Sequence, residues 1–194
     1  MHSERRKHRR GPPGRDTHRL EPVMTSKLWL IGMMSSGKTK VGRRLSVRSG
    51  LPLVDMDDQI VDRAGLTIPE IFATHGEPAF RAMESEEVAR IARRADRLVV
   101  ATGGGAILDR VNRSLMRDTG LVVWLKPSIG SLIAKGKTKN RPLLLGHDDL
   151  AARYTEIWEA RKHLYQEASH MAISMDGKTR KEVAEEVWSL WQRR

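Results

Sequence analysis

The chain contains no cysteine and no long apolar run. The absence of cysteine excludes a disulfide framework, a thiol nucleophile and a cysteine-ligated metal, and it is compatible with a reducing compartment. The apolar runs are far shorter than the ~20 residues needed to cross a bilayer. The basic start is not followed by the apolar segment of a secretory signal. We therefore expect a cytoplasmic protein without a membrane partner, and its 194 residues suffice for one domain with its own core.

The positive charge is unevenly distributed along the chain. A formal net charge of +11 makes nucleic acid the first partner to consider. Residues 1–23 carry seven Lys/Arg, three acids and three prolines, and they have too little apolar surface to offset their ordering entropy. We expect a disordered basic arm there. It could be a solvated leader ahead of a true start at Met24, a nucleic-acid-binding arm or a transit peptide. The remaining charge falls in 24–194, where anionic substrates can explain it.

From residue 27 onward, short apolar segments alternate with helical patterns. A helix after the first strand is indicated by the spacing of Val41, Leu45 and Val47 and by a stop at Gly50. Strands alternating with helices indicate an α/β domain whose parallel sheet is covered on both faces. The predicted strands are 28–31, 52–57, 97–102, 121–125 and 170–175. The predicted helices are 39–50, 57–64, 67–75, 77–94, 127–136, 148–168 and a last one opened by Thr179 and Glu182.

A complete phosphate-binding motif follows the first predicted strand. The segment GMMSSGKT has the spacing G-x-x-x-x-G-K-[ST], in which backbone N–H groups and a helix N-terminus surround phosphate oxygens. Lys38 would reach the β- and γ-phosphates, and the Thr39 hydroxyl would ligate Mg²⁺. A glycine-rich turn without special chemistry is the alternative, but the strand–helix context favours ATP. The predicted ATP contacts here are Gly32, Met33, Met34, Ser35, Ser36, Gly37, Lys38, Thr39 and Lys40.

An acidic pair stands at the end of the second predicted strand, at the edge where open α/β sheets bind ligands. Asp55 and Asp57 are two residues apart, so a strand would present both carboxylates on one face. One could organise Mg²⁺, and the other could accept a proton from a substrate hydroxyl. In the alternative interpretation, Asp57 or Asp58 only caps the helix that follows.

Taken together, the motifs resemble the shikimate kinase family from about Lys27 to the C-terminus. Six segments carry the resemblance: GMMSSGKTKVGRRL, LVDMD, IFATHGEPAFRAME, ATGGGAI, NRPLLL and RKHLY. The resemblance implies a three-layer α/β/α P-loop domain with a five-stranded parallel sheet, like that of the nucleoside monophosphate kinases. It also implies ATP- and Mg²⁺-dependent phosphorylation of the 3-hydroxyl of shikimate, which yields shikimate 3-phosphate and ADP on the route to the aromatic amino acids.

The resemblance also assigns roles to single residues. Asp55 would hold Mg²⁺ through water, and Asp57 would bind the shikimate hydroxyls and accept a proton. Two arginines, whose planar forks suit a carboxylate, would bind that group of shikimate, and Glu84 would orient the first of them. The implied shikimate contacts are Asp57, Arg81, Gly103, Gly104, Gly105 and Arg161. The catalytic residues would be Lys38, Asp57 and Arg141.

The basic segment 135–147 is expected to be a mobile lid that brings Arg141 over the phosphates. Lys178, after the fifth predicted strand, is a further ATP-side candidate. The sequence departs from the family pattern at several places: the lid carries lysines where an arginine is usual, Lys162 and His163 replace a usual proline, and two departures lie in or beside the phosphate loop. Ser35 stands where glycine is usual, so either the loop is strained there or the φ angle of Ser35 is negative. Lys40 replaces a hydroxyl residue.

Two other functions compete with this interpretation. A sister metabolite kinase, such as one acting on gluconate, would not need paired arginines beside the triple glycine. A basic nucleotide-dependent nucleic-acid-binding or regulatory protein would leave Asp57 and Arg161 unexplained. We expect a monomeric enzyme that meets nucleic acid only through nonspecific contacts of its arm. The scattered histidines are expected to be structural or at the surface, and the tryptophans to pack.

Overall fold

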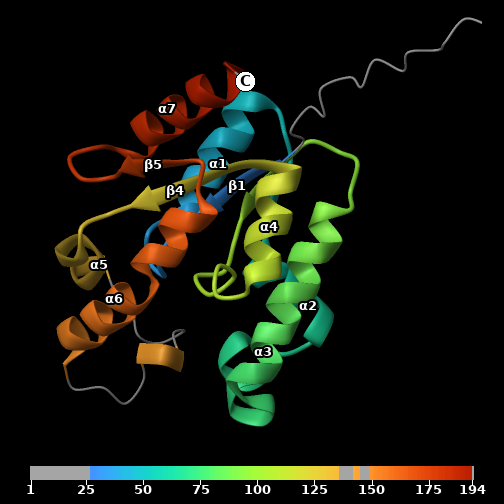
Figure 1. Cartoon of the computed structure of the whole chain (residues 1–194), viewed down its shortest axis with the longest axis vertical. Helices are drawn as coiled ribbons and strands as arrows, with labels where there is room; N and C mark the ends of the chain where they lie inside the picture. The colour runs from blue at the N-terminus through green and yellow to red at the C-terminus, as the bar shows by residue number, and fades with distance from the viewer. Residues whose placement is uncertain (1–26, 136–141, 145–148, 194) are drawn as a thin grey trace, which may run out of the picture.

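The computed structural model describes residues 27–135, 142–144 and 149–193. Within these residues, five parallel strands form one sheet in the order β2-β3-β1-β4-β5, with helices on both faces (Figure 1), so the predicted three-layer α/β/α architecture is confirmed. The strands are β1 Lys27–Ile31, β2 Leu53–Asp55, β3 Leu98–Ala101, β4 Gly120–Lys126 and β5 Met171–Ser174. The helices are α1 Lys38–Ser49, α2 Met56–Ala64, α3 Ile68–Ala92, α4 Arg110–Thr119, α5 Ile129–Lys135, the 3₁₀ turn η1 Pro142–Leu144, α6 Leu150–Ala168 and α7 Arg180–Gln192.

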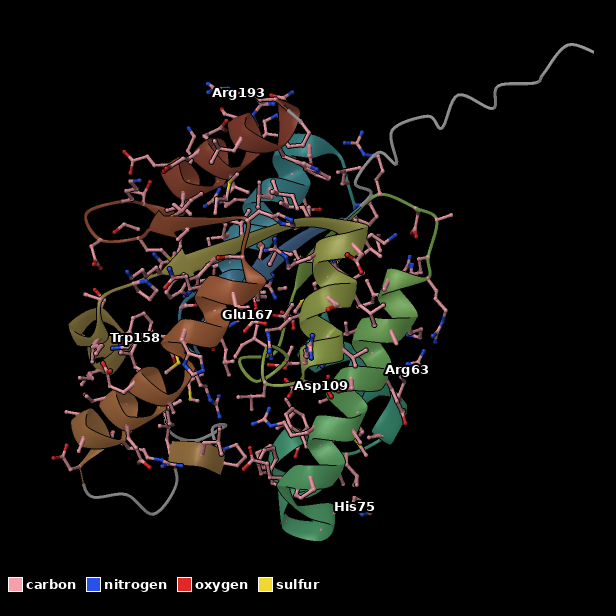
Figure 2. The ribbon with its side chains drawn as sticks, viewed as in Figure 1. Arg63, His75, Asp109, Trp158, Glu167 and Arg193 are labelled. Carbon is pink, nitrogen blue, oxygen red and sulfur yellow. The ribbon has the colours of Figure 1, made fainter. Side chains whose placement is uncertain are left out.

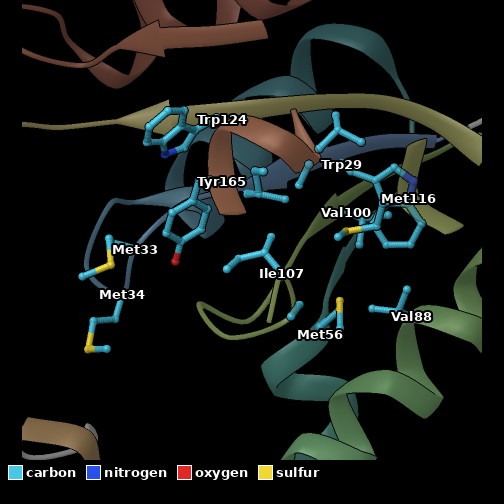
Figure 3. Packing of buried hydrophobic residues seen from close by; sticks show 14 of the residues in the cluster. Trp29, Met33, Met34, Met56, Val88, Val100, Ile107, Met116, Trp124 and Tyr165 are labelled. Atoms are coloured by element: carbon cyan, nitrogen blue, oxygen red, sulfur yellow. The ribbon is translucent and has the colours of Figure 1, made fainter. Parts of the chain in front are cut away.

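Alternation along the strands explains why both faces of the sheet are covered. In β1, Leu28 and Leu30 pack with α1 and α7, while Trp29 and Ile31 belong to the core under α3, α4 and α6. All four side chains are fully buried. A sheet that is apolar on both faces needs a layer of helices on each face, as the short apolar strands in the sequence predicted. Figure 3 shows the second of these cores, including Trp124 stacked on Tyr165 with ring centroids 5.7 Å apart.

The second strand ends earlier than predicted. β2 stops at Asp55, whose carboxylate accepts a hydrogen bond from the backbone N–H of Asp57 and so caps α2. The predictions that Asp57 belongs to the strand and that Asp57 or Asp58 caps the helix are therefore wrong. Asp57 lies in the first turn of α2. The physical reason is that an aspartate at the strand end satisfies the free N–H groups of the next helix at once.

Two further details differ from the sequence-based expectation. Val47 is 86% exposed, so the buried face of α1 consists of Val41 and Leu45 without it. Helix α4 was not predicted, because its segment carries few apolar residues and no apolar run. It begins where the Asp109 carboxylate accepts hydrogen bonds from the N–H groups of Val111 and Asn112 (Figure 2). A cap of this kind stabilises a helix start by about 1 kcal/mol.

The two helices predicted on either side of Gly76 form one kinked element. Gly76 has φ 78° and ψ 170°, a conformation that only glycine adopts easily, and Pro78 follows it. The first part begins with the predicted capping box, in which the Thr67 hydroxyl and the Glu70 carboxylate satisfy each other's backbone N–H groups. The kink lets the second part run along the sheet while the first part reaches beyond its edge (Figure 1).

Candidate active site

The phosphate loop connects the end of β1 with the start of α1. Gly32 has φ 151°, and a Cβ there would lie 2.6 Å from the carbonyl oxygen of Leu125. Lys38 folds back over the loop, and its Nζ donates to the carbonyls of Gly32 and Met33 at 2.8 and 3.0 Å. The ammonium is thereby held against the backbone of the loop, and its contact with the β- and γ-phosphates stays a prediction. The strand–loop–helix context that the motif requires is confirmed.

Residues from three strand ends meet at this edge of the sheet and line what we call the phosphate cavity. The Thr39 hydroxyl, in the first turn of α1, donates to the Asp55 carboxylate at the end of β2 over 2.6 Å. The two residues predicted to hold Mg²⁺ are therefore in contact. The lining residues are Ser35, Gly37, Lys38, Thr39, Lys40, Asp55, Asp57, Thr102, Gly104 and Arg180.

A second cavity, which we call the acceptor cavity, adjoins the first. Asp57 and Gly104 line both, so a group held in one cavity can reach a group held in the other. Phe72 and Phe80 form part of its apolar wall, and their rings also pack on each other in the small core between α2 and α3. The lining residues are Met34, Asp57, Ile68, Phe72, Phe80, Arg81, Glu84, Gly104, Gly105, Pro142, Leu143 and Arg161.

Arg81 is fixed at the wall of the acceptor cavity by two carboxylates on its own helix. It pairs with Glu77 over 2.7 Å and with Glu84, of which only 1% is exposed. Burial works to lower the pKa of Arg81, but Glu84 and Glu77 together raise it, so the guanidinium stays charged. Burial raises the pKa of Glu84, against the opposing effect of Arg81. Glu84 thus lies where the resemblance placed it, in contact with the first of the two arginines.

The triple glycine makes room for this ion pair. A Cβ on Gly103 would overlap the Glu84 carboxylate, and a Cβ on Gly105 would overlap the Arg81 guanidinium. At Gly104 the closest atom to a Cβ would be the backbone nitrogen of Met34, at 3.1 Å. The glycines therefore allow the protein's own charged side chains to approach the turn after β3.

Arg161 reaches the same turn from α6. It is buried, and its Nη1 donates to the carbonyl of Gly104 over 3.4 Å, beside the hydroxyl of Tyr165, which donates to the same carbonyl over 2.6 Å. Burial lowers the pKa of Arg161, and the charge of Arg81 lowers it further. Two arginines that face one small cavity repel each other, and an anionic group between them would relieve that repulsion.

The remaining residues of the predicted phosphate loop differ in what their side chains contact. Met33 belongs to the core, and Met34 lines the acceptor cavity instead of the phosphate cavity. Ser35 has φ 63°, so of the two alternatives for this residue the strained one holds. Its hydroxyl lies 3.2 Å from the hydroxyl of buried Tyr154 on α6. The buried Ser36 hydroxyl has no hydrogen-bond partner within the described residues.

Lys178, the predicted ATP contact on the loop after β5, lies outside the phosphate cavity. Lys178 pairs with Glu186 of α7 over 2.6 Å and does not line the phosphate cavity. Arg180, two residues later, does line it and was missed. Only its position at the first turn of a capped helix, near a fifth strand end, could have suggested it. Arg141 and most of the predicted lid lie outside the described residues, as does the predicted arm.

The structure also shows where the described histidines and tryptophans lie. His75 and His163 are exposed, and Figure 2 shows His75 on the lower part of α3, where it directly precedes the kink at Gly76. No three His, Asp or Glu side chains there are grouped so that they could hold a metal ion. Trp158 packs on Trp124, and Trp188 packs on Trp191. In the part of the chain that the structure covers, no helix is both long and apolar enough to span a membrane.

Comparison with known proteins identifies relatives over most of the chain. A family model described as "Shikimate kinase" matches residues 34–192. A shikimate kinase of Symbiobacterium thermophilum is 42% identical over 168 residues, which are 85% of this chain and 95% of that protein. One of Burkholderia thailandensis is 43% identical over 144 residues, 74% of this chain and 77% of the relative.

Solved structures agree with the sequence relatives. A shikimate kinase from Acinetobacter baumannii in complex with shikimate has a TM-score of 0.82 and 32% identity, over 87% of this chain and 93% of its own. A gluconokinase from Sinorhizobium meliloti has a TM-score of 0.52 at 17% identity, over 88% and 93% of the two chains, and shares only the fold.

A phosphate loop at the first strand end, with an adjoining cavity for a small acceptor, defines an ATP-dependent small-molecule kinase of the P-loop class. The fold, the motif and the relatives narrow this class further. The chain belongs to the shikimate kinase family.

Proposed function

We propose that the chain transfers the γ-phosphate of ATP to the 3-hydroxyl of shikimate, with the residues of the two cavities in the roles that follow. The single observation that carries the proposal is that Asp57 lines both cavities, while Arg81 and Arg161 face the acceptor cavity. ATP would lie over the phosphate loop, and the two guanidiniums would bind the shikimate carboxylate. The acceptor hydroxyl would then lie near Asp57.

The chemical step follows from this placement. The shikimate oxygen forms a bond to the γ-phosphorus as the bond to the β,γ-bridging oxygen breaks, and ADP leaves. Asp57 accepts the proton of the hydroxyl. Lys38 holds the β- and γ-phosphates and stabilises the negative charge that moves toward the leaving oxygen. Arg141 remains a predicted catalytic contact on the transferred group.

Thr39 and Asp55 fit a Mg²⁺ site. They present two hard oxygen ligands 2.6 Å apart beside the phosphate loop, and Mg²⁺ is usually bound by one or two protein oxygens together with water and substrate phosphates. Thr39 would ligate the ion directly and Asp55 through water. When bound, Mg²⁺ would neutralise phosphate charge and orient the β- and γ-phosphates. A monomeric state is proposed on the family resemblance, and a cytoplasmic location on the sequence composition.

A coupled assay of ADP release tests the proposal, with shikimate, gluconate or no acceptor. We expect turnover that depends on shikimate and stays at the acceptor-free level with gluconate. Equal rates with and without shikimate would contradict the proposal. Lys38→Met is the control for the phosphate loop, because removal of the ammonium leaves the γ-phosphate without its main positive partner. A Lys38→Met rate above roughly a tenth of the wild-type rate would rule out the assigned role of Lys38.

A further inference from the structure

Arg180 is placed against the phosphate loop by the start of α7. A Cβ on Gly37 would lie 3.0 Å from Nε of Arg180 and 3.4 Å from both Cζ and Nη2, so the guanidinium packs directly over the glycine that precedes Lys38. Helix α7 packs on α1, the helix that the loop opens (Figure 1). Arg180 lines the phosphate cavity together with Lys38 and Thr39.

The start of α7 is held in place by its cap. The Thr179 hydroxyl accepts from the N–H of Glu182, and the Glu182 carboxylate accepts from the N–H of Thr179. This reciprocal pair fixes the backbone one residue before Arg180. The guanidinium is therefore carried by the first residue of a capped helix.

Arg180 has no acidic partner within the described residues. Its buried Nε makes no hydrogen bond there, and no carboxylate lies within ion-pair distance. The glutamates nearby on α7 are engaged elsewhere: Glu185 with Arg48 and Glu186 with Lys178. A buried N–H without an acceptor is costly, so a ligand that supplies oxygen acceptors at this point would be favoured.

We infer that Arg180 is a nucleotide-binding residue whose guanidinium donates to the phosphate chain of ATP, an inference that rests on the proposed function. The groups beside it in the cavity are those that bind phosphate, and the planar guanidinium can donate two parallel hydrogen bonds to phosphate oxygens. Stacking of the same group on the purine ring is the other way in which it could contact ATP. The unpartnered Nε favours the phosphate, because stacking would leave this donor without an acceptor.

Arg180 also makes the phosphate cavity continuous with a basic surface. A neighbouring hollow is lined by Lys40, Arg43, Arg44, Val47 and Arg180. Arg180 and Lys40 line both, so positive charge extends from the phosphate loop along the outer side of α1. Such a field attracts a polyanion to the loop and makes its binding sensitive to salt.

The test is calorimetric titration of Arg180→Ala and Arg180→Lys with MgATP and with inorganic tripolyphosphate, in the absence of shikimate. We expect Arg180→Ala to weaken both ligands by about 10-fold or more, since a charge-assisted hydrogen bond is lost. Arg180→Lys should recover part of the loss. Lys181→Ala is the matched control, because this neighbouring lysine of α7 is exposed and does not line the cavity. It should bind both ligands like the wild type.

The possible outcomes separate the alternatives. Unchanged affinity of Arg180→Ala for both ligands overturns the inference. A weaker affinity for MgATP together with an unchanged affinity for tripolyphosphate would assign Arg180 to the purine base and overturn the phosphate contact. An equal loss of affinity in Lys181→Ala would assign the effect to the general positive charge of this region and would also overturn the inference. Thermal unfolding of each variant verifies that the fold persists. If the wild type binds MgATP but does not phosphorylate shikimate, the proposed function fails while this binding result stands.

Discussion

The hydroxyl of Thr39 donates a hydrogen bond of 2.6 Å to the carboxylate of Asp55, and so joins the phosphate loop to the neighbouring strand end. The same carboxylate accepts from the N–H of Asp57 at 3.1 Å and starts α2. One side chain therefore links the proposed metal site to the helix that carries the proposed base. This arrangement lets the roles of the two aspartates be tested separately.

The first prediction concerns Asp55. Asparagine caps helices as well as aspartate does, so Asp55→Asn should keep α2 and the fold. The loss of negative charge should raise the Mg²⁺ concentration needed for half-maximal activity by about 10-fold or more, since Mg²⁺ prefers anionic oxygen ligands. A magnesium titration of ADP release measures this. Asp109→Asn changes a comparable helix cap that does not line the phosphate cavity and should leave the titration unchanged. An unaltered magnesium requirement in Asp55→Asn would remove this residue from the metal site.

The second prediction concerns Asp57. Asp57→Asn should lower kcat by roughly 10² to 10⁴, the range of a general base, while the Kd for MgATP changes little. Its backbone hydrogen bond to Asp55 does not depend on its own side chain, so α2 should still begin at the same place. Steady-state kinetics and calorimetric binding of MgATP distinguish the two effects. A variant that is impaired mainly in ATP affinity would mean that the two aspartates have exchanged roles.

The phosphate loop and the layered fold could be predicted because they depend on local patterns. The G-x-x-x-x-G-K-[ST] spacing and the apolar strands each determine their structure within a few residues, and Thr67 with Glu70 forms a cap from neighbours alone. Asp57 was placed on the wrong element for the opposite reason. Strand and helix compete for it, and one hydrogen bond, which its backbone N–H donates to the Asp55 carboxylate, decides between them.

The contacts that link distant segments could not be predicted from residue order. Tyr165 donates to the carbonyl of Gly104, 61 residues away in sequence, and Arg180 packs over Gly37 from the last helix. Nothing in either local sequence indicates its partner. The resemblance to a family supplied Arg81 and Arg161. On the last loop the predicted ATP-side candidate was Lys178, whereas the structure brings Arg180 to the cavity.

The third prediction concerns Ser35 and Tyr154. A non-glycine residue at φ 63° costs roughly 1 kcal/mol, and the hydrogen bond to buried Tyr154 helps to hold it there. Tyr154→Phe should therefore destabilise the protein by about 1 kcal/mol and raise the KM for ATP. In a Ser35→Gly background the same change should have a smaller effect on both. Urea unfolding and kinetics of the four combinations give the coupling. If the two changes simply add, the contact does not hold the loop.

The fourth prediction follows from the burial of Glu84. Its pKa is raised mainly by burial, so ionisation of Glu84 costs more free energy in the folded protein than in the unfolded chain and lowers the stability. This loss begins as the pH rises above the unfolded value of about 4.3 and is complete above the raised folded pKa. Glu84→Gln, which cannot ionise, should therefore be more stable than the wild type at pH 7. Below about pH 4 the two should unfold alike.

The same substitution should impair substrate binding. Arg81 would keep Glu77 but lose the buried carboxylate that holds it beside Gly105, so the KM for shikimate should rise by about 10-fold while that for ATP stays constant. Thermal unfolding from pH 4 to 8 and kinetics at pH 7 test both halves. Glu77→Gln removes the more exposed partner of the same guanidinium, and its stability should stay within about 0.5 kcal/mol of the wild type. A lower Tm of Glu84→Gln at pH 7 would show that the ion pair stabilises the fold, and an unchanged shikimate KM would show that Glu84 does not orient Arg81.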